Sequence, residues 1–306
     1  MKTLISIVGT TGIGKTKLAI DLARYYHTEI LSCDSRQFFK EMTIGTASPT
    51  EEELSLAPHH FVGNLSVENY YSIGQYELDA LIKTQELFQK YDTLILVGGS
   101  MMYEKALIEG LNDLPESNEE NQQKLVSILQ NEGIEELQKL LKNLDKKYFE
   151  NVDLNNPRRL LRAIDVMWQT GKKYSNLISQ QKPKRAFRTI RIGIKAPRET
   201  IYERINLRVD KMIESGLIDE VKSLQKFDND LIALKTVGYT EIFKYLRGEW
   251  ELDFAISEIK KNSRRFAKRQ LTWYCKEENI HWVDYQTAFA ESVDFLTKKL
   301  QKLQKV

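Results

Sequence analysis

The sequence has little cysteine and no long apolar run. Among its 306 residues are two cysteines, Cys33 and Cys275, too few and too scattered for a disulfide framework or a zinc site. No apolar run approaches the roughly 18 residues that a membrane-spanning helix needs. Residues 2–8 read directly as a strand, so we expect no signal peptide. These absences predict a protein of the reducing cytoplasm, with no membrane segment.

The chain also has little excess charge of either sign. Its 45 Lys and Arg residues nearly balance 43 Asp and Glu residues, and the formal net charge is +2. Total charge therefore neither favours nor excludes a nucleic-acid partner, so the distribution of charge must be considered. The length is sufficient for a large core and for one large or two modest domains.

The most informative motif begins where the first predicted strand ends. The octapeptide Gly9-Thr10-Thr11-Gly12-Ile13-Gly14-Lys15-Thr16, here called the phosphate loop, fits G-x-x-x-x-G-K-[ST] and precedes an amphipathic helix. Its backbone N–H groups and the helix N-terminus can cradle phosphate oxygens. Lys15 can add a positive charge, and the Thr16 hydroxyl can bind Mg²⁺. A chance glycine turn is disfavoured by the flanking strand and helix, so we predict a site for a di- or triphosphate.

One element of nucleotide hydrolysis is missing. ATPases, GTPases and kinases with such a loop usually carry an aspartate at the end of a later apolar strand, where it holds Mg²⁺. Here the best candidate strand, residues 94–97, ends in Gly98-Gly99. This absence favours a site in which the phosphates are held rather than hydrolysed.

Asp34 ends the second predicted strand. Ligands of open α/β sheets bind at the carboxyl ends of the strands, so Asp34 should face the same crevice as Lys15. There it could bind Mg²⁺, contact a ribose or act as a general base. The alternative is a structural cap on a following helical turn. The polar run from Asp34 to Gln37 could also face a substrate.

Strands and helices alternate over the first 110 residues. Predicted strands at 28–33 and 93–97 are each followed by a helical pattern, and residues 190–196 restore a strand with alternating isoleucines. This order predicts an α/β fold with a parallel, doubly wound, P-loop NTPase-like sheet flanked by helices.

A polar helical segment interrupts this predicted core. Residues 113–188 are rich in Lys, Glu and Asn and contain no convincing strand. We therefore predict a discontinuous catalytic core of residues 1–112 and 189–306, with residues 113–188 as an all-helical insertion domain.

Two segments of the predicted core are less regular. Residues 43–60 read as an irregular loop, and residues 281–283 as a short strand. His59-His60 is predicted to be a loop element rather than a metal pair, because adjacent side chains point apart and no further ligand completes a set.

A basic stripe is predicted on the helix that covers residues 258–274. Its six cations recur as pairs every four residues: Lys260, Lys261, Arg264, Arg265, Lys268 and Arg269. Positions four residues apart drift by only about 40° around a helix, so the six should share one face. A solvated face normally alternates charge signs, but residues 260–274 contain no acid. The stripe therefore favours contact with nucleic-acid phosphates over a merely solvated surface.

Other cations form smaller groups. Arg158, Arg159 and Arg162 lie in the helical segment, and a further cluster comprises Lys182, Lys184, Arg185 and Arg188. Arg204 and Arg208 are four residues apart on a predicted helix. They could form surface ion pairs with Glu203 or Glu199, or they could clamp a diphosphate.

Seven ordered motifs then carry a resemblance. They are the phosphate loop, Asp34-Ser35-Arg36-Gln37, Ile44-Gly45-Thr46-Ala47, Gly98-Gly99-Ser100-Met101-Met102-Tyr103, Asn156-Pro157-Arg158-Arg159-Leu160, Thr236-Val237-Gly238-Tyr239 and Lys268-Arg269-Gln270-Leu271-Thr272-Trp273. Together they resemble the bacterial tRNA dimethylallyltransferases, over essentially the whole chain. Thr10 and Thr240 depart from the family pattern, which usually has proline and often arginine at these positions.

The resemblance implies a reaction and its catalytic residues. A dimethylallyl group would pass from dimethylallyl diphosphate to N6 of the adenosine just 3′ of the tRNA anticodon, and diphosphate would leave. Asp34 matches the family's catalytic aspartate and would remove the N6 proton. The phosphate loop, Lys15, Mg²⁺ on Thr16, and Arg208 would stabilise the departing diphosphate. The family is generally monomeric.

The resemblance also implies a set of tRNA contacts. The target base would be extruded from its loop, and the helical insertion would hold the anticodon stem-loop mainly through shape and backbone charge. The matching residues are Asp34, Ser35, Arg36, Gln37, Ser100, Gln122, Arg158, Arg159, Leu160, Leu161, Arg162, Lys235, Gly238, Tyr239, Arg264, Arg265, Lys268 and Arg269.

Two other functions compete with this one. The first is an isopentenyltransferase that acts on free AMP or ATP, against which the helical insertion and the basic stripe argue. The second is a small-molecule kinase or a nucleotide-binding switch, which would consume ATP or GTP without any prenyl diphosphate.

Overall fold

The computed structural model of the protein describes residues 2–179, 184–228 and 230–304. The chain divides into two compact units, one formed by Met1–Ile108 with Arg185–Val306 and the other by Glu109–Lys184. Within the described ranges, no helix is both long enough and apolar enough to cross a membrane.

The larger unit is built on a parallel sheet. Among the described residues it has six strands in the order β3-β2-β4-β1-β5-β6, and every pairing is parallel. The strands are β1 (Thr3–Val8), β2 (Ile30–Ser32), β3 (His59–His60), β4 (Thr93–Val97), β5 (Arg188–Lys195) and β6 (Ile280–Asp284). The predicted α/β sheet is confirmed, including the short strand at 281–283. Central strands such as β1 are buried along their whole length because helices cover both faces.

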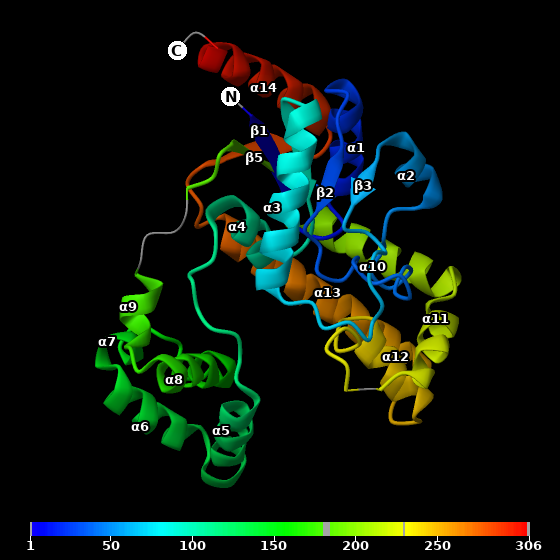
Figure 1. Ribbon diagram of the computed structural model, residues 1–306. Helices are drawn as coiled ribbons and strands as arrows, with labels where there is room; N and C mark the ends of the chain where they lie inside the picture. The colour runs from blue at the N-terminus through cyan, green and yellow to red at the C-terminus, as the bar shows by residue number, and fades with distance from the viewer. Residues whose placement is uncertain (1, 180–183, 229, 305–306) are drawn as a thin grey trace. The chain divides into compact units, whose positions relative to one another are not determined.

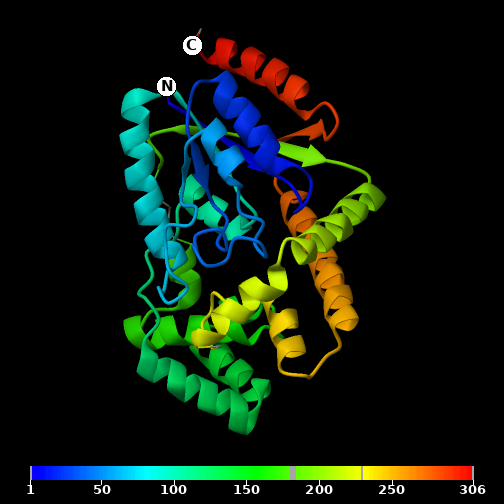
Figure 2. The same ribbon diagram turned by 90° about the vertical axis from the view of Figure 1, so that its right-hand side faces the viewer.

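Alternate residues of the central strands face two helical layers (Figures 1 and 2). Ile5 packs in a core with residues of α1 (Lys15–Tyr25) and α14 (Ala288–Gln304). Its neighbour Leu4 packs in a second core with residues of α3 (Ile73–Lys90) and α4 (Met101–Glu109). The sheet is therefore sandwiched, and its strand ends are left to build a site.

A further helical layer closes the carboxyl side of this unit. It contains α10 (Arg198–Glu214), α11 (Leu217–Ser223), the 3₁₀ turn Leu224–Lys226, α12 (Tyr239–Leu246) and α13 (Leu252–Tyr274). Val209, Leu217 and Ile242 share a core with Phe39 and Met42, which come from the segment after β2. This core anchors the polar run that begins at Asp34.

All the regular elements among the described residues of the smaller unit are helices. It contains α5 (Glu119–Glu132), α6 (Ile134–Leu144), α7 (Lys146–Phe149), α8 (Pro157–Thr170) and α9 (Tyr174–Ile178). Leu125, Leu141 and Ile164 form its core with their neighbours. The helix α8 begins with a side-chain cap from Asn156 and a proline in its first turn, and it ends at Gly171 in the left-handed conformation.

The predicted insertion boundary at residue 188 needs correction. Arg185 donates to the backbone oxygens of Ala106 and Leu107 and pairs with Glu77 on α3, so it belongs to the larger unit. Arg188 is the first residue of β5 and donates to the Thr3 hydroxyl at 2.7 Å. These two arginines are therefore structural. Lys182, from the same predicted basic cluster, lies outside the described residues.

The segment 43–60 is more ordered than predicted. It contains α2 (Glu51–Leu56) and the edge strand β3, which is formed by the two histidines that were expected in a loop. His60 Nε2 lies 2.6 Å from Glu29 Oε2, an interaction 31 residues apart in sequence. Among the described residues, no group of three or more His, Cys, Asp or Glu side chains could hold a metal ion.

Candidate active site

The phosphate loop connects β1 to α1 and takes its shape from three glycines. Gly9, Gly12 and Gly14 have φ values of 143°, 77° and 107°, which side-chain-bearing residues rarely adopt. No side chain caps the N-terminus of α1, so its first N–H groups can serve an anion. Thr10 and Ile13 are buried, and the Ile13 N–H donates to the Thr10 oxygen at 3.4 Å within the loop.

Lys15 folds back over this loop. Its Nζ donates to the backbone oxygens of Gly9 at 3.1 Å and Thr10 at 2.8 Å. Burial lowers the pKa of Lys15 to about 8; Arg208 also lowers it, whereas Asp34 opposes the shift. A bound diphosphate would supply the negative charge that favours the ammonium form.

Two arginines of α10 reach the phosphate loop. Arg208 donates from Nη1 to Thr11 Oγ1 and from Nη2 to the Thr46 oxygen, both at 3.3 Å. Burial lowers the pKa of Arg208, and Asp34 opposes that shift. Arg204 donates from Nε to the Gly12 oxygen at 2.8 Å. The structure therefore places this pair against the loop, as the clamp interpretation requires.

Asp34 follows β2 and is held by two backbone donors. Its Oδ1 accepts from Arg36 N at 3.1 Å, and its Oδ2 accepts from Gly99 N at 3.0 Å. A Cβ on Gly98 would lie 2.5 Å from the Cys33 carbonyl carbon, and a Cβ on Gly99 would lie 2.6 Å from Asp34 Oδ2. The glycine pair after β4 therefore makes room for the aspartate. Asp34 and Lys15 interact electrostatically, as the predicted common crevice requires.

Gln270 on α13 is a site residue that sequence reasoning missed. Its Oε1 accepts from Thr11 N at 2.7 Å, and its Nε2 donates to the Gly99 oxygen at 2.8 Å. The side chain is fully buried. The only sequence signal was its place in one of the seven motifs, beside the more conspicuous Lys268 and Arg269.

Glu220 is a second missed residue, and it fixes the segment from Thr43 to Thr46. Its carboxylate accepts from the backbone N–H groups of Thr43, Ile44 and Gly45 and from the Tyr239 hydroxyl. A Cβ on Gly45 would lie 2.5 Å from the Tyr239 ring, so only glycine fits there. The Thr46 oxygen that Arg208 contacts is thereby held in place.

Replacing Glu220 with Gln should destabilise the protein. One oxygen would become an NH₂ group that faces backbone donors, so the free energy of unfolding should fall by about 2 kcal/mol. Urea unfolding followed by circular dichroism measures this. The neighbouring Asp219→Asn removes an exposed pair with Lys222 and should change the value by less than about 0.5 kcal/mol. Equal effects of the two variants would contradict the structural role of Glu220.

Several predicted tRNA-contacting residues gather next to Asp34. The Ser35 backbone N–H donates to Ser100 Oγ at 3.0 Å, and the two hydroxyls are 2.7 Å apart. Arg36 Nη1 donates to the Ile232 oxygen at 3.0 Å, and Gln37 Nε2 donates to the Ala47 oxygen at 3.0 Å. These bonds fix the polar run at the edge of the site.

Some predicted tRNA contacts need correction. The side chains of Leu160 and Tyr239 are fully buried, so neither can meet a macromolecule. Arg162 donates to the Pro115 oxygen and lies 3.5 Å from Asp165 within its own unit, and its contact with tRNA stays a prediction. The exposed residues Arg158, Arg159 and Lys235 and the half-buried residues Gln122 and Leu161 stay predictions, as does Gly238, whose backbone caps α12.

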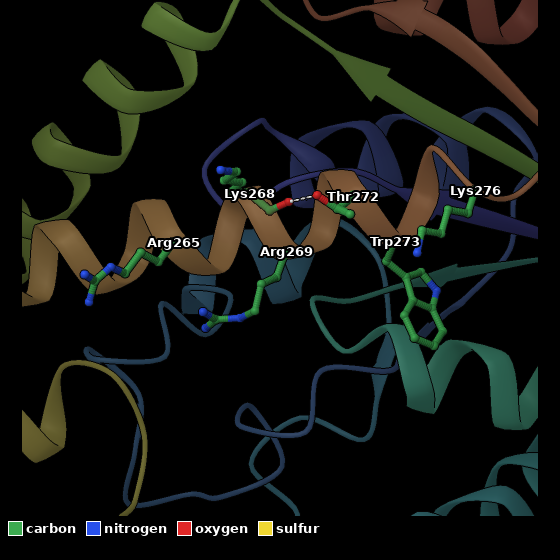
Figure 3. A pocket seen from close by; sticks show the side chains of 6 residues that line it. All are labelled: Arg265, Lys268, Arg269, Thr272, Trp273 and Lys276. Carbon is green, nitrogen blue, oxygen red and sulfur yellow. Dashed lines mark hydrogen bonds between the residues drawn. The ribbon is translucent and has the colours of Figure 1, made fainter. Parts of the chain in front are cut away.

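The basic stripe on α13 is divided by its neighbours. Lys260 pairs with Asp210 of α10, Lys261 pairs with Glu258, and Arg264 donates to Asn206. The prediction of one acid-free face is therefore wrong for Lys260 and Lys261, because carboxylates lie beside both of them. Arg264 instead contacts the neutral amide of Asn206. The exposed part remains basic, and it lines a shallow pocket formed by Arg265, Lys268, Arg269, Thr272, Trp273 and Lys276 (Figure 3).

The exposed cations point to different sides of this helix. Figure 3 shows Arg265, Arg269 and Trp273 directed to one side of α13, whereas Lys268 points to the other. Arg269 also lies over the Phe266 ring at 5.7 Å. This surface combines flexible cations with an aromatic face, a combination that suits a nucleic-acid backbone and an unpaired base.

Residues 37–277 match the family model described as IPP transferase. The chain belongs to this family. A tRNA dimethylallyltransferase of Christiangramia forsetii is 48% identical over 97% of this chain and 98% of its own length. One from Flavobacterium johnsoniae is 47% identical over 98% and 99%. The family identified from the seven motifs is thereby confirmed.

Solved structures of IPP transferase relatives also match. A tRNA isopentenylpyrophosphate transferase of Bacillus halodurans is 33% identical, with a TM-score of 0.74 over 100% of this chain and 99% of that one. A eukaryotic dimethylallyltransferase acting on tRNA is 26% identical, with a TM-score of 0.83 over 97% and 80%. These likenesses confirm the predicted P-loop NTPase-like fold of this transferase.

Proposed function

We propose that the protein transfers the dimethylallyl group of dimethylallyl diphosphate to N6 of the adenosine 3′ of the anticodon in tRNA. The observation that carries this proposal is the placement of Asp34 beside a phosphate loop with no carboxylate after β4. Such a site has a base and a diphosphate cradle but lacks a typical metal-binding aspartate of nucleotide hydrolysis. The names of the relatives support the choice of tRNA as acceptor.

Asp34 would act as the general base. The lone pair of an adenine amino group is delocalised into the ring, so N6 is a weak nucleophile. Removal of its proton as the new bond forms makes attack easier. The N6–C1 bond forms, the C1–O bond to diphosphate breaks, and the proton passes to Asp34. The N–H groups of Arg36 and Gly99 orient the carboxylate for this transfer.

The phosphate loop would stabilise the leaving diphosphate, whose negative charge grows in the transition state. Lys15, Arg208 and the N–H groups at the start of α1 lie at the phosphate loop, and they would stabilise that charge. The Thr16 hydroxyl would be the protein ligand of a Mg²⁺ ion that accompanies the diphosphate. When bound, this ion would neutralise part of the diphosphate charge.

Each unit would contribute separately to tRNA binding. The larger unit offers Arg265, Lys268 and Arg269 on α13, and the smaller unit offers the exposed Arg158 and Arg159 at the start of α8. Their contacts would be mainly with phosphates, which sets affinity without reading sequence. We further propose that the protein works as a cytoplasmic monomer.

The test is prenyl transfer from dimethylallyl diphosphate to an adenosine-containing anticodon stem-loop, followed by mass spectrometry of the RNA. A mass increase of one dimethylallyl group on that adenosine is expected, together with release of diphosphate. If turnover with free AMP or ATP equalled turnover with the stem-loop, the assignment of tRNA as the substrate would be wrong. Consumption of ATP or GTP without any prenyl diphosphate would favour a kinase or switch instead.

Charge reversal on the exposed part of the basic stripe should weaken tRNA binding. Arg265→Glu with Arg269→Glu should lower the slope of log affinity against log salt by about two, because each lost phosphate contact contributes nearly one. Filter binding at several salt concentrations measures this. Charge reversal of Lys83 and Lys90 on α3 is the control. If the salt slope of the α13 variant did not change, Arg265 and Arg269 would be solvated cations that do not contact tRNA.

A further inference from the structure

One buried polar side chain of the active site, that of Gln270, has no part in the chemistry described so far. Gln270 is fully buried, and its two amide atoms bridge segments that are far apart in sequence. Oε1 binds Thr11, 259 residues away, and Nε2 binds Gly99, 171 residues away. A buried amide with both ends satisfied is a rigid spacer between its partners.

Each partner of this amide belongs to a different half of the proposed reaction. Thr11 is a phosphate-loop residue, and its hydroxyl accepts from Arg208. Gly99 donates its own N–H to Asp34 Oδ2 at 3.0 Å. Hydrogen bonds on either side of Gly99 therefore connect the diphosphate cradle, through Gln270 and the backbone of Gly99, to the aspartate.

We propose that Gln270 is a positioning residue that sets the phosphate loop in register with Asp34. This inference rests on the proposed function, because it assigns the two linked segments to the leaving group and the base. The argument for this role is geometric. The base must remove a proton from N6 while diphosphate leaves C1, the carbon to which N6 becomes bonded, so both groups must be placed correctly at the same time. Small errors in such placement are costly, and a shift of about 1 Å can reduce a rate about 10²-fold.

Two substitutions separate the two bonds. Gln270→Met keeps the approximate volume but removes both bonds. Gln270→Glu keeps an acceptor for Thr11 N, removes the donor to the Gly99 oxygen and adds a negative charge near the diphosphate cradle. Gln286→Met, an exposed position before α14, is the matched control. The melting temperature of each variant shows whether it folds. If Gln270→Met does not fold, Gln270→Glu is used in its place.

Gly99→Ala provides an independent way to move Asp34. Its Cβ would lie 2.6 Å from Asp34 Oδ2, so the carboxylate must shift whether or not Gln270 is present. If Gln270 acts through Gly99, the double variant should be little slower than the slower single variant. A residue that only fills space in the core would instead give losses that multiply.

Steady-state transfer to the stem-loop and calorimetric binding of inorganic diphosphate complete the experiment. For Gln270→Met, kcat should fall about 10²-fold, and affinity for inorganic diphosphate should fall about fivefold as the loop loses one neutral hydrogen bond. Affinity for tRNA should stay within about twofold, because α13 keeps its exposed cations. The inference would be overturned if the losses of kcat in the Gln270 and Gly99 variants multiplied in the double variant. It would also be overturned if Gln270→Met had the same kcat and diphosphate affinity as Gln286→Met. If the wild-type protein transfers no prenyl group, the proposed function fails. The calorimetric affinity for inorganic diphosphate then decides alone whether Gln270 positions the phosphate loop.

Discussion

Replacing Asp34 with Asn is expected to reduce kcat for prenyl transfer by about 10³-fold while tRNA affinity stays within about twofold. The amide cannot take the N6 proton, and general bases contribute about 10²- to 10⁴-fold to such reactions. The change keeps the size of the side chain and leaves one oxygen to accept a backbone N–H. Single-turnover transfer to the stem-loop and filter binding of tRNA are the two measurements.

A matched variant controls for the loss of a carboxylate. Asp21→Asn removes an acid on α1 that pairs with Lys17 at 3.0 Å, away from the site, and should leave kcat unchanged. If Asp34→Asn lost tRNA binding together with turnover, Asp34 would be a structural or RNA-contacting residue. The capping role considered from sequence would then regain support, since Asp34 does accept from Arg36 N.

Replacing Lys15 with Ala should reduce kcat/KM for dimethylallyl diphosphate by about 10²- to 10³-fold, the usual effect of removing one preorganised group that stabilises developing charge. Its ammonium lies at the phosphate loop and is partly stripped of water. Lys17→Ala, two residues later on the exposed side of α1, is the control and should change little. Unchanged kinetics in Lys15→Ala would remove the loop lysine from the mechanism.

The pKa of Lys15 also gives the reaction a pH dependence. In the free protein burial lowers this pKa to about 8, and a bound diphosphate must raise it. Binding therefore takes up a proton above pH 8, so affinity for inorganic diphosphate should fall as the pH rises from 8 to 9.5. Calorimetry in two buffers of different ionisation enthalpy detects the proton, and Lys15→Ala should abolish that uptake.

Local patterns predicted the parts of the site that are contiguous in sequence. The phosphate loop needs only a strand, three glycines and a helix start, all within residues 3–25. Asp34 needed one further step, because a parallel sheet brings its strand ends to one edge. In both cases the position of the residue follows from the adjacent strand, loop and helix, which the sequence pattern predicts.

Contacts between distant segments were beyond such patterns. Glu220 binds backbone groups about 175 residues earlier, and nothing around it in sequence signals that role. The basic stripe failed for a related reason, because Asp210 on α10 lies beside Lys260 although residues 260–274 contain no acid. The roles of such polar residues depend on partners that are distant in sequence and become neighbours only in the folded chain.

The glycines that follow β4 determine how much space the Asp34 carboxylate has. Any side chain at position 99 would push against the Asp34 carboxylate, and one at position 98 would push against the backbone that precedes it. A metal-binding aspartate of the kind used in nucleotide hydrolysis would need space at that strand end. A side chain at either glycine would therefore conflict with the present position of the Asp34 carboxylate or of the backbone before it.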